Sequence, residues 1–353
     1  MRFLKFLLAL FIVSFAFAGG LSARYFKESI ARSATQREFF RAQVADIQAK
    51  TGQALKEKAE KEYTFLFVGD IMLSRGVDYY IQKYGNGDYR YPFLKIADTI
   101  RSADLTFGNL EGPISARGKN QGSIYSFRAN PKVIEGLKDA GFDAMSVANN
   151  HIWDWGREAL EDTVQLLTTN DIRPIGAGMN YEEANNPKLF TLGSPSGSLG
   201  ASTRIAVLAY TNLMPKSLEA TVSHSGLSQF EPELIKQAIF NVQNQADIVV
   251  VSLHWGEEYQ THSNEFQRKL THELINAGAD LVIGHHPHVV QEIEQYKQGW
   301  IAYSLGNFVF DQGFSEETSK GLMLKVEVSN GKISDVEKIP IRINATAQPE
   351  VAE

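Results

Sequence analysis

From Tyr63 onward, short apolar runs alternate with longer amphipathic stretches, and this alternation constrains the fold more than any other feature of the sequence. The runs are continuously apolar, as expected of strands buried on both faces. They cover residues 64–68, 104–107, 144–148, 204–210, 247–253, 280–283 and 300–305. The stretches between them predict helices near residues 91–102, 131–140, 157–170, 232–245 and 263–277. We therefore expect an α/β fold whose central sheet is covered on both faces.

The end of this region predicts a β-hairpin. Residues 322–328 and 332–339 have strand character and are separated by Ser329-Asn330-Gly331, which is typical of a tight turn. The Gly/Ser-rich segment 193–202 predicts a loop, because it lacks the Lys and the following helix of a phosphate-binding loop. We place the main domain at residues 63–343 and a C-terminal tail at residues 344–353.

The N-terminal segment predicts export from the cytoplasm. Residues 1–5 are basic, residues 6–18 are apolar apart from Ser14, and small residues follow. This apolar core is shorter than the ~20 residues that span a bilayer, which favours cleavage after Ala18 over an uncleaved anchor that runs to Ala23. With residues 1–23 as a signal peptide or membrane anchor, the domain reaches the cell envelope, in a periplasmic or other extracytoplasmic location.

Residues 24–62 form a polar segment with no Pro and a single Gly, which predicts a helical linker. Such a helix could act as a stalk or bind a partner, but we favour a solvated spacer. Residues 1–62 carry 11 Lys and Arg against 6 Asp and Glu, whereas residues 63–353 carry 24 against 35. An acidic main domain repels a phosphate backbone, so we expect no nucleic-acid partner unless a bound cation reverses the local field.

Polar side chains that can bind metal ions follow six of the predicted strands. Each run ends in a carboxylate, an amide or an imidazole: Asp70, Asn109 with Glu111, Asn149 with Asn150 and His151, His254, His285 with His286 and His288, and Asn307. Ligands gather beyond the carboxyl ends of strands in open α/β sheets. Five of the eight histidines lie at these ends, and the chain has no cysteine. We therefore expect a site for a divalent metal such as Zn, Mn or Fe, built without sulfur ligands.

The segment His286-Pro287-His288 supports this site. Proline restricts the residue before it to extended backbone, in which alternate side chains share one face. We expect both imidazoles to reach one centre, and His285 to point away as a structural or supporting residue.

Six motifs of the chain resemble those of the bacterial capsule-synthesis CapA family, which is associated with poly-gamma-glutamate and belongs to the calcineurin-like metallophosphoesterase superfamily. They are Gly69-Asp70-Ile71-Met72, Asn109-Leu110-Glu111, Ala148-Asn149-Asn150-His151, His254-Trp255-Gly256-Glu257-Glu258-Tyr259, Gly284-His285-His286-Pro287-His288-Val289 and Tyr303-Ser304-Leu305-Gly306-Asn307-Phe308-Val309. The resemblance covers about residues 63–343.

The resemblance implies a four-layer α/β/β/α sandwich with a centre of one or two divalent metal ions. By position, Asp70 and His288 would bind a first ion, Glu111 would bridge, and Asn150, His254 and His286 would bind a second ion. His151 would be the catalytic acid that protonates a leaving group. The implied partners are an anionic polymer such as poly-gamma-glutamate, or a phosphoester, together with capsule synthase proteins of the membrane.

The motifs also depart from the superfamily pattern. Met72 stands where a typical member has a histidine, and a thioether is a poor ligand for a hard ion. Glu111 replaces an aspartate, and Asn109 differs too. Two functions follow: metal-dependent hydrolysis of a phosphoester or an anionic polymer, or non-catalytic binding of the polymer during capsule synthesis or export.

Further side chains near the predicted ligands could contact a substrate. Trp153, Trp155, Trp255 and Tyr259 could form an aromatic wall, although packing in the core or rim is the favoured interpretation. Arg75 and Arg128 are the nearest candidates to contact an anion, with solvated surface as the alternative.

Overall fold

The computed structural model describes residues 24, 38–39, 41–50, 62–193 and 202–352 of the chain, which divides into two units, residues 1–59 and residues 60–353. In the first unit, residues 41–50 are helical. The predicted signal of residues 1–23 lies outside the described residues, as do most of the predicted linker and residues 194–201 of the predicted loop. Within the described part of the chain, no helix combines the length and the apolar character needed to cross a membrane.

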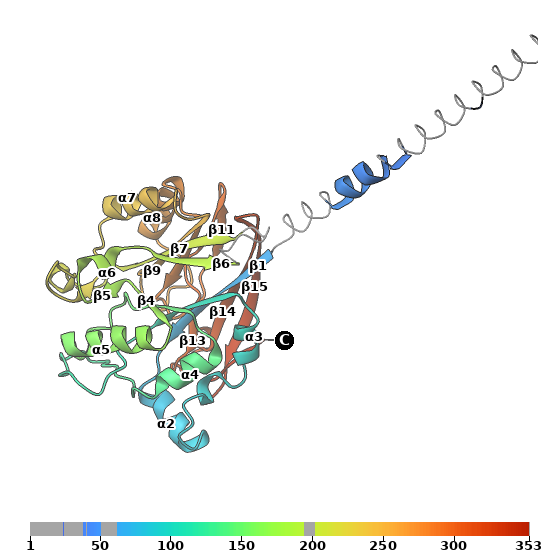
Figure 1. Ribbon diagram of the computed structural model, residues 1–353. Coiled ribbons are helices and arrows are strands. Elements are labelled where there is room, and N and C mark those ends of the chain that lie inside the picture. The colour runs from blue at the N-terminus through green and yellow to red at the C-terminus, as the bar shows by residue number, and fades with distance from the viewer. Residues whose placement is uncertain (1–23, 25–37, 40, 51–61, 194–201, 353) are drawn as a thin grey trace, which may run out of the picture. The chain divides into compact units, whose positions relative to one another are not determined.

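The second unit contains two large β-sheets (Figure 1). The first sheet has the order β16-β15-β14-β1-β2-β3-β4, and β13 also pairs with the end of β1. Its strands are β1 (Glu62–Ile71), β2 (Leu105–Leu110), β3 (Ala144–Ser146), β4 (Arg173–Ile175), β13 (Asn307–Val309), β14 (Lys320–Ser329), β15 (Lys332–Ile343) and β16 (Pro349–Val351). Strands β1 to β4 are parallel, and β14 to β16 are antiparallel.

The second sheet has the order β11-β12-β10-β9-β7-β6. Its strands are β6 (Lys188–Leu192), β7 (Thr203–Thr211), β9 (Ile248–His254), β10 (Leu281–His285), β11 (Ile293–Tyr296) and β12 (Gly299–Ala302). The four inner strands are parallel, whereas β6 and β11 at the edges run antiparallel to their neighbours. A small third sheet pairs β5 (Ala177–Gly178) with β8 (Gly226–Leu227).

Helices cover the outer faces of both large sheets. They are α2 (Arg75–Tyr84), α3 (Ala97–Arg101), α4 (Val133–Ala140), α5 (Gly156–Thr169), α6 (Tyr181–Asn185), α7 (Pro232–Val242) and α8 (Glu265–Asn276), with short 3-10 turns η1 (Tyr91–Phe93), η2 (Lys216–Leu218) and η3 (Glu317–Ser319). The sequence explains the start of α8, because Asn264 and Gln267 form a reciprocal capping box.

The packing produces four layers in the order α/β/β/α. Phe65 and Phe67 of β1 belong to the same buried cluster as Val207 of β7 and Val250 of β9, so the inner faces of the sheets meet. A second cluster packs the outer face of the second sheet against α7 and α8. The expected single central sheet is therefore wrong, and the four-layer sandwich implied by the resemblance is confirmed. A continuously apolar strand shows that both faces are covered, but it does not show whether a helix or another sheet covers them.

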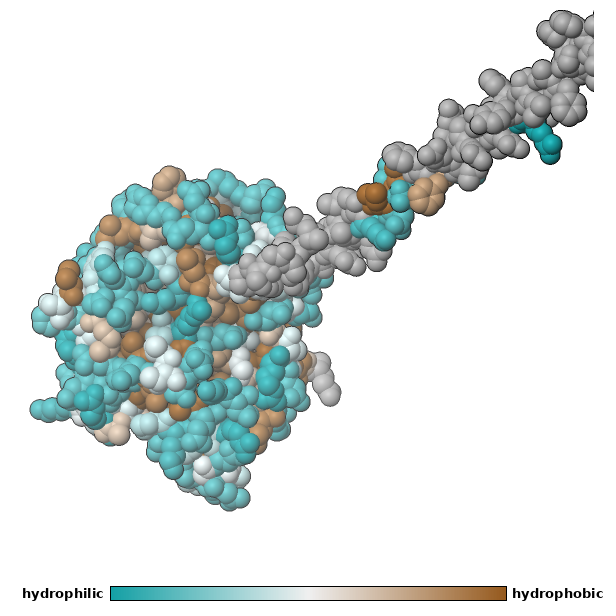
Figure 2. All heavy atoms as spheres, viewed as in Figure 1, coloured by the Kyte–Doolittle hydropathy of each residue, from teal (hydrophilic) through white to brown (hydrophobic). Residues whose placement is uncertain are grey.

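Some predicted elements also differ from the structure. The region 91–102 divides into η1 and α3, and helix α2 was not predicted. The predicted tail contains β16, which pairs with β15. The predicted hairpin is confirmed, because β14 and β15 pair across a turn in which Asn330 and Gly331 both have positive φ. On the face shown in Figure 2, hydrophilic residues predominate and apolar residues are scattered among them.

A repeated aspartate contact joins neighbouring strands at their amino ends. The residues involved are Asp104 before β2, Asp143 before β3, Asp247 before β9 and Asp280 before β10. Each aspartate carboxylate accepts a hydrogen bond of 2.7–2.8 Å from a backbone N–H on the adjacent strand. The backbone N–H of the same aspartate donates to a carbonyl oxygen of that strand. These aspartate clasps satisfy backbone groups that would otherwise have no partner where the strands begin.

Candidate metal centre

The predicted site residues converge at the carboxyl ends of both sheets. Asp70 lies at the end of β1, and Glu111 directly follows β2. His254 ends β9, and His286 and His288 follow β10. The first sheet therefore supplies the carboxylates of the predicted ligand set, and the second sheet supplies its imidazoles.

Close backbone contact positions Asp70. A Cβ added at Gly69 would lie 2.0 Å from the carbonyl oxygen of Gly306, so only glycine fits there. This approach lets Asp70 N donate to the same oxygen at 3.0 Å. The side chain is consequently held at the junction of the two sheets.

The backbone of the His286-Pro287-His288 segment is not extended, which corrects the sequence prediction. His286 has φ 97° and His288 has φ 57°, both in the left-handed region. Two hydrogen bonds hold this turn: His286 N donates to Asp70 Oδ2 at 3.2 Å, and Tyr259 N donates to Pro287 O at 2.8 Å. Tertiary contacts thus override the local preference of the residue before proline, and the turn still directs both imidazoles toward the carboxylates.

Asp70 is completely buried and surrounded by donors. Its Oδ1 accepts from Asn109 Nδ2 at 2.9 Å and lies 3.2 Å from His285 Nδ1, while its Oδ2 lies 3.4 Å from His288 Nδ1. Burial alone raises the pKa of Asp70, but the contacts with His285 and His288 outweigh it and hold the pKa well below its usual range. Asp70 is therefore a carboxylate. The expectation that His285 points away from the centre is wrong, because its Nδ1 contacts Asp70, although this contact is consistent with a supporting role.

Glu111 is equally buried but has no hydrogen-bond partner for either carboxylate oxygen among the described residues. Its Oε1 lies 3.6 Å from His288 Nε2 and 3.8 Å from His151 Nε2. Burial raises the pKa of Glu111 to about 7. A buried carboxylate without a donor is costly, and a cation would balance it.

His254 and His286 are uncharged imidazoles. Burial lowers the pKa of His254 well below its usual range, and burial together with the charge of His288 lowers that of His286 to about 4. His254 Nε2 lies 2.8 Å from Asn150 Oδ1, and the ring centroids of His254 and His286 are 5.0 Å apart. Neutral imidazole is the form that binds metals.

His288 differs from these two imidazoles. Burial alone lowers its pKa, but the Glu111 charge and the Asp70 contact outweigh that effect and raise the pKa to about 9. Its Nδ1 also lies 2.9 Å from Asn307 Oδ1. Nε2 is thereby left facing Glu111.

The residues present fit a divalent cation. Two groups of residues could each hold an ion, because within each group one potential ligand atom per residue lies within 4.8 Å of the others. The first group is Asp70, Glu111 and His288, and the second is Glu258, His286 and His288. His286 Nδ1, like both oxygens of Glu111, is buried without a hydrogen-bond partner among the described residues. Carboxylate and imidazole donors suit Mn, Zn or Fe. The roles of Asp70, Glu111, Asn150, His254, His286 and His288 as ligands remain predictions.

His151 lies beside the centre in an oriented position. Its Nδ1 lies 2.7 Å from Asp154 Oδ2, its ring stacks on Phe127 with centroids 3.9 Å apart, and its Nε2 faces Glu111. A carboxylate behind an imidazole holds the ring and its tautomer in place. His151 therefore directs its Nε2 toward the centre, where this atom can exchange a proton.

Sequence reasoning missed Glu258 and Asp154. Glu258 belongs to the motif that begins at His254, but it lies in a loop without strand or helix periodicity. Asp154 lies three residues after His151, a spacing that could have suggested a carboxylate partner within a turn.

The aromatic candidates fall into two groups: Trp255 and Tyr259, and the tryptophans that contact arginines. Trp255 is fully buried and its Nε1 donates to Tyr303 O at 3.4 Å, so it is a core residue. Tyr259 is 42% exposed, and its ring centroid lies 6.1 Å from that of His288 and 5.3 Å from that of Phe314.

Trp153 and Trp155 instead contact arginines. The guanidinium of Arg157 lies 5.1 Å from the ring centroid of Trp153, and that of Arg128 lies 3.5 Å from the ring centroid of Trp155. Arg75 pairs with Asp311 at 2.6 Å and lies 5.0 Å from the ring centroid of Phe127. Arg75 and His151 thus contact the same ring, that of Phe127.

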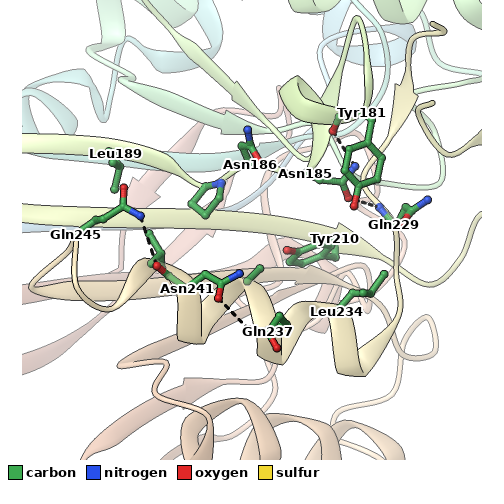
Figure 3. A pocket seen from close by; sticks show the side chains of 13 residues that line it. Tyr181, Asn185, Asn186, Leu189, Tyr210, Gln229, Leu234, Gln237, Asn241 and Gln245 are labelled. Carbon is green, nitrogen blue, oxygen red and sulfur yellow. Dashed lines mark hydrogen bonds between the residues drawn. The ribbon is translucent and has the colours of Figure 1, made fainter. Parts of the chain in front are cut away.

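A cavity in the described part of the chain lies away from this centre (Figure 3). It has a volume of about 500 Å³ and lies between α6, β6 and α7, where Asn185, Gln229, Gln237 and Asn241 line it. Its lining contains no carboxylate, imidazole, lysine or arginine. It therefore offers neither the carboxylates nor the imidazoles that form the predicted centre.

Comparisons with known proteins place the chain among capsule-synthesis proteins. A family described as bacterial capsule synthesis protein PGA_cap matches residues 64–312. The chain is 31% identical to the capsule biosynthesis protein CapA of Bacillus anthracis, over 82% of this chain and 69% of that protein. It is 33% identical to the PGA biosynthesis protein CapA of Bacillus subtilis (strain 168), over 80% and 72%. Among solved structures, a novel phosphatase from Mycoplasma pneumoniae is 14% identical with a TM-score of 0.47, over 80% of this chain and 94% of that chain.

Proposed function

Because the chain belongs to the bacterial capsule synthesis family PGA_cap, we propose that it is an exported, metal-dependent hydrolase of capsule synthesis. It cleaves a phosphoester or a bond within an anionic polymer such as poly-gamma-glutamate. The observation that carries this proposal is His151, which is held by Asp154 and directed at the cluster of potential ligands. Metal binding alone does not require such a residue.

In this proposal the converging side chains hold one or two divalent ions. Asp70, Glu111 and His288 form one side of the centre, and Asn150, His254 and His286 form the other. A bound ion supplies an activated water and balances charge on the attacked group. It also offsets the acidic surface that would otherwise repel a polyanion.

His151 acts as the general acid. Its Nδ1 contacts Asp154 at 2.7 Å, which fixes the direction of the ring. Nε2 delivers a proton to the leaving group and then accepts one from water. Tyr259, whose partly exposed ring lies 6.1 Å from that of His288, contacts the substrate chain.

Export forms part of the proposal and rests on the N-terminal sequence pattern. Cell fractionation with an antibody to the main domain tests it. Protein retained in the cytoplasm would contradict it.

The test of hydrolysis compares wild type with His151→Ala and His254→Ala at equal folded abundance. With Mn²⁺ added, a phosphodiester dye and poly-gamma-glutamate are the two substrates, and metal content is measured in parallel. His151→Ala should keep its metal and lose about 10²–10⁴ in rate, whereas His254→Ala should lose metal as well.

The alternative is a binding factor without catalysis. Full capsule production in cells by His151→Ala, together with failure of His254→Ala, would overturn the hydrolase and favour that alternative. Wild type that cleaves neither substrate would also contradict the proposal.

A further inference from the structure

Met72 occupies the position where the superfamily resemblance implies an imidazole, and its sulfur is already engaged. The side chain is fully buried, and its Sδ accepts hydrogen bonds from Ser74 N at 3.2 Å and from Ser74 Oγ at 3.1 Å. A soft thioether with two donors against it is a poor ligand for a hard divalent ion. The centre therefore lacks one ligand that the resemblance implies.

Glu258 reaches the centre from the loop after β9. The next residue, Tyr259, has φ 63°, an unfavourable value for a bulky side chain, and its N–H donates to Pro287 O at 2.8 Å. This hydrogen bond attaches the Glu258 loop to the turn that carries His286 and His288. Backbone strain at Tyr259 is thus compensated by a contact that places Glu258.

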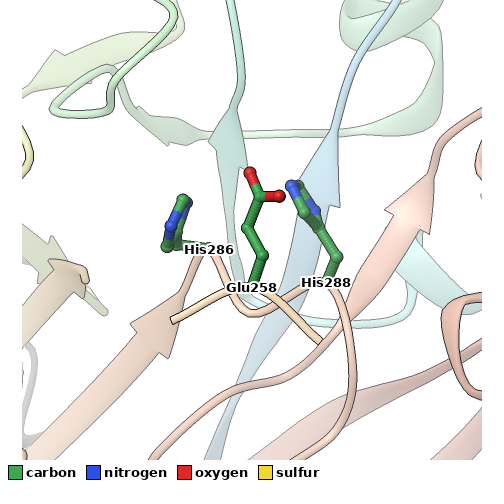
Figure 4. Close-up of side chains that lie close together, drawn as sticks. All are labelled: Glu258, His286 and His288. Atoms are coloured by element: carbon green, nitrogen blue, oxygen red, sulfur yellow. The ribbon is translucent and has the colours of Figure 1, made fainter. Parts of the chain in front are cut away.

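Figure 4 shows the result: the Glu258 side chain rises between His286 and His288, with its carboxylate beside the His288 ring. One potential ligand atom from each residue lies within 4.8 Å of the others. His286 is only 7% exposed, and its Nδ1 has no hydrogen-bond partner in the described part of the chain. A nearly buried, unpartnered imidazole nitrogen beside a carboxylate indicates a cation between them.

We propose that Glu258 supplies the metal ligand that Met72 does not, and binds a divalent cation together with His286 and His288. This inference rests on the metal centre of the proposed function and changes which ions that centre should prefer. A carboxylate in place of an imidazole adds negative charge next to Asp70 and Glu111, which favours harder ions such as Mn²⁺ over Zn²⁺.

The chain offers a matched control at the adjacent position. Glu257 and Glu258 are both exposed, so Glu257→Gln and Glu258→Gln remove the same charge from the same loop. The full chain is stripped with a chelator and titrated with Mn²⁺ and with Zn²⁺ by calorimetry, and bound Mn²⁺ is followed by electron paramagnetic resonance. Glu258→Gln should weaken Mn²⁺ binding by about tenfold or more and alter the spectrum, while Glu257→Gln stays within about twofold of wild type.

A second variant tests directly whether Glu258 replaces the imidazole that is missing at residue 72. Met72→His in the Glu258→Gln background should restore tight binding and shift the preference toward Zn²⁺, because it returns an imidazole in place of the carboxylate. Thermal unfolding of each stripped variant identifies any that fails to fold, and Glu258→Ser then replaces Glu258→Gln.

The outcomes separate the two proposals. Wild type that binds no divalent cation would overturn the metal centre and this inference with it. Tight binding by wild type with equal affinities for Glu257→Gln and Glu258→Gln would overturn only the role of Glu258.

Discussion

The two ends of the parallel strands use acidic residues in opposite ways. At the amino ends, each of the four aspartate clasps accepts a backbone N–H from the neighbouring strand. At the carboxyl ends, Glu111 is buried with no donor at either oxygen among the described residues. Carboxylates therefore stabilise the sheets at the amino ends, whereas at the carboxyl ends the buried carboxylate of Glu111 has no such role.

This difference shows what distinguishes a structural acid from a candidate ligand. Burial is not sufficient, because Asp280 is also largely buried and its pKa is raised by that burial, with a backbone N–H opposing the shift. What sets Glu111 apart is that neither of its oxygens has a donor among the described residues, whereas Asp280 and the predicted ligand Asp70 both accept hydrogen bonds. Four variants or conditions test this comparison of the two ends, from the largest expected effect to the smallest.

The largest effect is expected at the carboxyl end, in His254→Ala. Removing this imidazole should weaken Mn²⁺ binding by about 100-fold or more, since even residues that only support a ligand contribute about 10–100-fold. His262→Ala is the control, because His262 lies outside the cluster. Calorimetric titration of both variants measures the effect, and equal affinities would refute the assignment of His254.

The second effect is a loss of stability at alkaline pH that is confined to the metal-free protein. The pKa of His288 is raised to about 9, so its contribution to stability is complete below about pH 6.5 and is lost as the pH rises through 9. Urea unfolding of chelator-treated protein should show a loss on the order of 2 kcal/mol between pH 6.5 and pH 9.5. Saturating Mn²⁺ should abolish the difference; a persistent difference would place its origin outside the centre.

The third effect belongs to the amino end. Asp280→Ala leaves the backbone N–H of Val249 without its 2.8 Å acceptor, which should lower the free energy of unfolding by about 1–2 kcal/mol. Mn²⁺ affinity should stay within about twofold of wild type. A large loss of affinity would show that the two ends are not independent.

The smallest effect is expected for Met72→His in the otherwise unchanged chain. If Met72 leaves a ligand position open, the new imidazole should raise metal occupancy toward two ions per chain, at most a doubling. If Glu258 already fills that position, the stoichiometry should stay unchanged. Metal analysis at saturating Mn²⁺ in Met72→His, with and without Glu258→Gln, distinguishes the two: a gain in the single variant would contradict the role of Glu258, and no gain in either background would mean that residue 72 does not face the centre.

The carboxyl end was more predictable from the sequence than the layering of the sheets. Polar residues after apolar runs indicated Asp70, Glu111 and His254, because the ends of parallel strands meet at one edge. Glu258 gave no such signal, since the contact between Tyr259 and Pro287 places it and that contact joins segments far apart in the chain. The presence of two sheets was unpredictable for a related reason: an apolar strand does not reveal what packs against it.

The position of β1 has a consequence for how the protein is made. This strand is the first of the main unit, yet its neighbour β14 begins at Lys320, some 250 residues later. During synthesis one edge of β1 stays without a partner until nearly the whole chain has left the ribosome, and pairing over such distances is slow. Truncation before β14 therefore removes three strands from one side of the first sheet and leaves β1 exposed along that side. The nascent chain carries the same open strand edge, which invites association with other chains.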